Sequence, residues 1–94
     1  MGKTAYRQKA EAKIQEQQAR IAEARAKAKG GVADARISAE KQIDELEAKL
    51  EIAKKKLAEI GDAAEGAWED ISKSLDDAWD DISSGLKKVM NRFS

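Results

Sequence analysis

The sequence contains no cysteine and no histidine among its 94 residues. Without them the chain has no imidazole base, no thiolate nucleophile and none of the usual zinc ligand sets. The absence of cysteine also excludes a disulfide framework. We therefore expect a protein that is not an enzyme and that binds neither a cofactor nor a metal ion.

Long hydrophobic runs are also missing. The first thirteen residues, MGKTAYRQKAEAK, contain no continuous apolar segment. An N-terminus without such a segment fits neither a secretory signal nor a membrane-spanning helix. We expect a cytoplasmic protein.

Residues that favour strands or break helices are scarce. Proline is absent and valine occurs only twice, whereas Ala, Glu, Lys, Leu and Arg make up 51 of the 94 residues. This composition is typical of coiled coils and long helices. The sequence predicts a single all-α domain over residues 1–94, built as an elongated helical hairpin or a three-helix bundle with coiled-coil-like packing.

Glycines divide the chain into three segments of similar length. The apolar heptad phase slips by one residue across Gly30 and Gly31, which predicts a helix over 3–29, a turn at 30–31 and a second helix over 32–60. At the second division, Gly61 suits a helix C-terminus, and Asp62 with Glu65 imitates a capping box. We expect a turn or kink at 61–62 and an amphipathic helix over 62–92. An uninterrupted helix from residue 32 to 91 is the alternative, because the apolar phase continues through this point.

A tandem eleven-residue repeat is the most informative feature of the chain. AWEDISKSLDD at 67–77 is followed by AWDDISSGLKK at 78–88, with six of eleven positions identical. Eleven residues span three helical turns, so the repeat aligns one apolar stripe along a helix. We call this the C-terminal stripe and predict that it mediates self-association or forms the core. Its members are Leu57, Ile60, Trp68, Ile71, Leu75, Trp79, Ile82, Leu86, Met90 and Phe93.

The formal net charge is zero, but charge is unevenly distributed. Residues 1–30 carry eight Lys/Arg and three Glu, whereas residues 61–94 carry four Lys/Arg and eight Asp/Glu. The basic first third is therefore expected to pack near the acidic last third, with Arg20, Arg25 or Lys27 relieving repulsion among the aspartates at 76, 77, 80 and 81. Nucleic-acid binding is disfavoured, because glutamates interrupt the basic segment and only one tyrosine could stack on bases.

Two further surfaces invite a binding role. Ile37 and Ile52 lie off the heptad seam of the second predicted helix, which indicates a second contact face. Trp68 and Trp79 on the amphipathic segment 62–94 favour an alternative function, peripheral binding to a membrane or lipid surface. The acidic polar face of this segment opposes that alternative, because anionic lipids attract Lys and Arg.

The segment KLAEIGDAAEGAWEDISKSLDDAWDDISSGLKKVMNRF, with its Gly-Asp-Ala and repeated Ala-Trp-(Glu/Asp)-Asp motifs, resembles small bacterial coiled-coil proteins associated with the stress response. The resemblance implies a helical protein without catalytic residues or a cofactor. Together with the long apolar stripe, it leads us to expect a non-enzymatic protein that forms homo-oligomers and has a stress-response role.

Overall fold

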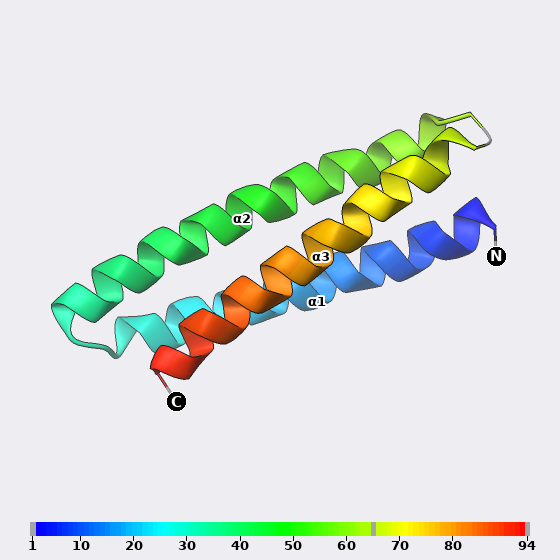
Figure 1. Cartoon of the computed structure of the whole chain (residues 1–94). Helices are drawn as coiled ribbons and strands as arrows, with labels where there is room; N and C mark the ends of the chain where they lie inside the picture. Colours follow the sequence, from blue (N-terminus) through cyan, green and yellow to red (C-terminus); the bar gives the residue numbers. More distant parts are fainter. Residues whose placement is uncertain (1, 65, 94) are drawn as a thin grey trace.

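Three long helices form an elongated bundle in the computed structural model, which describes residues 2–64 and 66–93. Helix α1 spans Lys3–Lys29, α2 spans Ala33–Asp62 and α3 spans Ala67–Arg92. α1 and α3 run in the same direction, and α2 runs antiparallel to both (Figure 1). The molecule measures 50 × 17 × 16 Å, so the predicted all-α three-helix bundle is confirmed.

The first turn lies at the predicted glycine pair. Gly30 caps α1 in a helical conformation, with its N–H donating to the Lys27 carbonyl, and α2 begins after Val32. A Cβ added to Gly31 would lie 2.6 Å from Cε1 of Phe93. The glycine at this position therefore allows the C-terminal aromatic ring to pack directly on the turn between α1 and α2.

The second turn does not lie at residues 61–62, and the uninterrupted helix over 32–91 is also wrong. Gly61 and Asp62 are the last residues of α2, and the backbone becomes extended at Ala63 (φ −74°, ψ 145°). Gly66 then adopts φ +97°, a conformation that is costly for residues with a Cβ, and α3 follows at once. Asp62 is consequently not an N-cap, and the Glu65 of the expected capping box lies outside the described residues.

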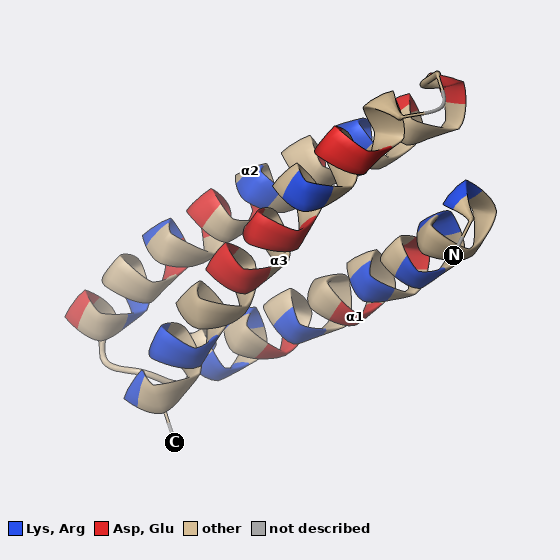
Figure 2. Cartoon of the chain, turned by 45° about the vertical axis from the view of Figure 1, so that its right-hand side comes forward, with Lys and Arg blue, Asp and Glu red and all other residues tan. Residues whose placement is uncertain are grey.

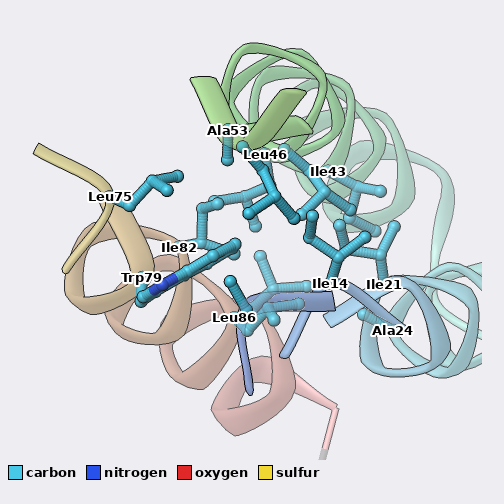
Figure 3. Close-up of a cluster of buried hydrophobic side chains, with 14 of the residues drawn as sticks. Ile14, Ile21, Ala24, Ile43, Leu46, Ala53, Leu75, Trp79, Ile82 and Leu86 are labelled. Atoms are coloured by element: carbon cyan, nitrogen blue, oxygen red, sulfur yellow. The ribbon is translucent and has the colours of Figure 1, made fainter. Parts of the chain in front are cut away.

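The core is built from one stripe of each helix. Figure 3 shows side chains from all three helices pointing into the same interior. Their spacing alternates between three and four residues on α1 and α2, as expected for coiled-coil-like packing. The buried apolar residues are Ala10, Ile14, Ile21, Ala24 and Ala28 on α1, Ala39, Ile43, Leu46, Leu50, Ala53, Leu57 and Ile60 on α2, and Leu75, Trp79, Ile82, Leu86 and Val89 on α3.

The two copies of the eleven-residue repeat differ at the position occupied by Ser74 and Gly85. Lys56 Nζ donates to the Ser74 hydroxyl oxygen. At Gly85, an added Cβ would lie only 2.5 Å from Cδ2 of Leu46. The loss of the side chain in the second copy therefore allows α3 to approach α2 closely.

Candidate functional site

The C-terminal stripe lies in the interior of the folded chain. Its members at positions 57, 60, 75, 79, 82 and 86 are at most 6% exposed. The members at positions 68, 71, 90 and 93 are partly buried and pack against this core. Leu57 and Ile60 belong to α2, so the stripe does not run along a single helix as predicted. Its members are nevertheless covered within the same chain, and the folded molecule does not present them as a free surface.

Burial within the repeat increases along α3. Trp68 and Ile71 of the first copy are partly buried, whereas the equivalent Trp79 and Ile82 are 5% and 0% exposed. The Trp68 ring lies beside Tyr6, with ring centroids 6.0 Å apart and planes tilted by 46°. The first copy therefore meets the N-terminal end of α1, and the second meets the middle of the bundle.

Polar contacts between α1 and α3 follow the same eleven-residue interval. The Tyr6 hydroxyl donates to the Ser72 carbonyl at 3.1 Å, and Gln17 Nε2 donates to the Ser83 hydroxyl at 3.2 Å. Ser72 and Ser83 occupy equivalent repeat positions, and their partners on α1 are also eleven residues apart. The repeat thus sets the register between the two parallel helices.

The hydroxyl of Tyr6 also lies next to a carboxylate. Its oxygen is 3.2 Å from Oδ1 of Asp76, so its single proton is shared between this carboxylate and the Ser72 carbonyl. Burial, followed by the negative charge and the hydrogen bond of Asp76, raises the pKa of Tyr6 from 10.0 to about 12. The neutral phenol is therefore favoured in the folded state.

Asp76 and Asp81 of α3 have partners other than those predicted, and the partner of Asp76 is Tyr6. Asp81 pairs with Lys49 of α2 at 2.7 Å. The expected partners on α1 pair elsewhere: Arg25 with Asp44 and Glu47 of α2, and the cations at 20 and 27 with glutamates of α1 itself. Within residues 2–64 and 66–93, no ion pair joins α1 to α3, and no acidic cluster is arranged to hold a metal ion.

A hollow of the surface runs between α1 and α2, and we call it the α1–α2 groove. Two adjoining hollows of about 780 and 450 Å³ share Gln18, and no residue of α3 lines either one. The core side chains Ile14, Ile21, Leu50 and Leu57 form part of its floor. The hollows along the other two helix pairs measure about 380 and 200 Å³.

The walls of the α1–α2 groove combine small side chains with opposite charges. The small wall residues are Ala22, Ala26, Ala48 and Ala58, all of which are exposed. The charged residues of the α1 wall are Arg7, Glu11, Arg25 and Lys29, and those of the α2 wall are Asp44, Glu47, Glu51 and Lys54. The α1 wall is net positive and the α2 wall is net negative. Figure 2 shows that Lys and Arg also lie along the rest of α1.

Sequence reasoning found part of the exposed apolar surface but missed the groove. Ile37 and Ile52 are 62% and 55% exposed, and Val32 is 75% exposed. No apolar pattern in the sequence marks the groove, because α1 lines it mostly with polar and charged residues such as Glu11 and Gln18.

Comparison with known proteins finds no family, no curated protein and no solved structure that matches this chain. Across residues 2–64 and 66–93, no helix combines the length and the apolar character needed to cross a bilayer.

Proposed function

We propose that this protein is a non-enzymatic helical bundle that acts by self-association. The proposal is supported by the α1–α2 groove, whose floor includes the core side chains Ile21 and Leu50. The reason for self-association therefore differs from the one inferred from sequence, because the C-terminal stripe is covered within the chain. A stress-response role rests on the resemblance of the Ala-Trp-(Glu/Asp)-Asp repeat alone.

Sedimentation equilibrium over micromolar concentrations tests this proposal. We expect the mass to rise above that of the 10.3-kDa chain as concentration increases. A mass that stays at one chain throughout, together with cooperative unfolding, would remove self-association from the account.

Peripheral lipid binding through residues 62–94 is the alternative function. Trp79 is 5% exposed in the bundle, so its apolar face could enter a lipid surface only after α3 separates from α1 and α2. The connection between α2 and α3 is the point at which this separation would occur. A blue shift of Trp emission is not diagnostic, because the ring is already shielded from water in the bundle.

Vesicle flotation combined with quenching by a quencher placed in the lipid tails distinguishes the two functions. Lipid binding predicts co-flotation and quenching of Trp79. Self-association without lipid binding predicts neither.

A further inference from the structure

We propose that the α1–α2 groove is the binding site for a second copy of this chain. In the resulting dimer, α1 of each copy lies over α2 of the other. This inference rests on the proposed self-association and specifies its surface and its geometry. The product is a two-fold dimer in which α1 and α2 of both copies form a four-helix layer, with one α3 on each outer side.

The charges of the groove walls select this arrangement. A two-fold axis parallel to the helices places the positive α1 wall of one copy over the negative α2 wall of the other. A two-fold axis across the helices would instead place α1 over α1 and α2 over α2, with like charges facing each other. Helix direction does not distinguish the two arrangements, since the facing helices are antiparallel in both, as in up-down-up-down four-helix bundles.

The positions of the charged residues along the long axis of the bundle, which we call their heights, agree with the same arrangement. Rotation about an axis parallel to the helices preserves the height of each residue. Within one chain, Arg25 Nη2 lies 3.1 Å from Asp44 Oδ1 and 2.6 Å from Glu47 Oε1, which fixes the height of Arg25 at these two carboxylates. The Arg25 of the second copy therefore lies at the same height on the α2 wall. The carboxylates of Asp44 and Glu47, which are 69% and 49% exposed, can form an ion pair with it.

The dimensions of the groove match a second copy. Its lining extends from residue 7 to residue 29 on α1, which is about 33 Å of helix. A groove of this length accommodates about six turns of a partner helix. Alanines at 22, 26 and 48 allow the partner helices to approach closely because they add little bulk to the walls.

A matched pair of substitutions tests the surface. Ala22 lies in the groove and Ala12 lies on α1 outside its lining, and both side chains are exposed. Ala22→Glu inserts bulk and negative charge opposite the partner's acidic α2 wall, whereas Ala12→Glu makes the same change elsewhere on the helix. In sedimentation equilibrium we expect the wild type and Ala12→Glu to be dimers and Ala22→Glu to weaken the dimer at least tenfold. Circular dichroism of both variants checks that the helical fold is kept.

Cysteine cross-linking tests the orientation. Ala22 of α1 and Ala48 of α2 lie at similar heights, as the bonds of Arg25 to Asp44 and Glu47 indicate. We mix chains carrying only Ala22→Cys with chains carrying only Ala48→Cys and oxidise them. The proposed dimer predicts mixed disulfides between the two variants. Disulfides predominantly between two copies of the same variant would overturn the proposed orientation.

The outcomes separate this inference from the proposed function. A wild-type dimer that persists undiminished in Ala22→Glu overturns the groove as the interface and leaves self-association standing. A wild-type chain that remains a monomer at all concentrations overturns both. Loss of the dimer in Ala22→Glu alone, with mixed disulfides, supports the inference.

Discussion

At the scale of single residues, Gln17 is the polar side chain that the helices bury in their core. It is 1% exposed, its Nε2 donates to Ser83, and its Oε1 has no hydrogen-bond partner. An unsatisfied buried acceptor costs about 1–3 kcal/mol, which exceeds the 0.5–1.5 kcal/mol of a typical hydrogen bond. The register contact with Ser83 is therefore obtained at a net cost in stability.

Replacing Gln17 by leucine, a residue of similar size, should remove this cost. We expect Gln17→Leu to raise the free energy of unfolding by about 1 kcal/mol in urea denaturation. Gln17→Ala is the control and should lower it, because truncation leaves a cavity. A loss of stability in Gln17→Leu would show that Oε1 has a partner in solution, such as a water molecule.

Tyr6 should make the stability of the bundle sensitive to alkaline pH. Its pKa is raised from 10.0 to about 12 in the folded state, so the folded chain retains a proton that the unfolded chain releases. The stabilising contribution is complete below pH 10 and is lost as the pH rises through about 12. Tyr6→Phe has no such proton to lose. The difference in the free energy of unfolding between wild type and Tyr6→Phe should therefore shrink or reverse from pH 10 to pH 12. A constant difference would argue against the shifted pKa.

At the scale of helices and turns, the connection between α2 and α3 depends on the backbone of Gly66. Its φ of +97° is strained for any side chain, although an added Cβ would meet nothing within 4 Å. We expect Gly66→Ala to lower the free energy of unfolding by about 1–3 kcal/mol. Gly30→Ala is the matched control, because Gly30 has φ −83° and its added Cβ makes only an ordinary contact. This control should be neutral or stabilising by up to about 1 kcal/mol in thermal denaturation. Equal effects at both glycines would contradict a special role for Gly66.

The two tryptophans of the repeat offer a second test at this scale. Trp79 is buried and Trp68 is partly buried, although both occupy the same repeat position. Trp79→Ala should lower the free energy of unfolding by about 3–5 kcal/mol. This is a large part of the roughly 5–15 kcal/mol that stabilises a typical domain. Trp68→Ala should have a distinctly smaller effect in urea denaturation, and a reversed order would contradict the unequal burial of the two repeat copies.

At the scale of the whole molecule, charge should affect association more than folding. The ion pairs of the described residues join side chains that are mostly exposed, and such pairs contribute only about 0–1 kcal/mol each. Raising the salt concentration from about 0.1 to about 1 M shortens the screening length from about 10 to about 3 Å. We expect the melting temperature of a variant that remains monomeric to change little. The proposed dimer should weaken over the same range, because it brings oppositely charged walls of the groove together. A dimer that strengthens with salt would indicate an interface dominated by apolar contacts.

The sequence by itself determined the helices, the first turn and the residues that face inward, because these properties follow from local composition and periodicity. Gly30 and Gly31 mark the turn, and the spacing of Trp68, Trp79 and their neighbours marks the buried stripe. The burial of Gln17 was not predicted from the sequence, because a polar side chain gives no reason to expect a core position.

Only the tertiary structure decided where α2 ends and what covers the stripe. α2 continues one residue past Gly61 and ends at Asp62, and α3 begins after Gly66. These boundaries depend on how α3 packs back against α1 and α2. An apolar stripe is equally satisfied by helices of its own chain or of another, since burial of apolar surface has no directional preference. The fold resolved this ambiguity by placing α3 in register with α1 through Tyr6 and Gln17, which left the opposite face of the hairpin open.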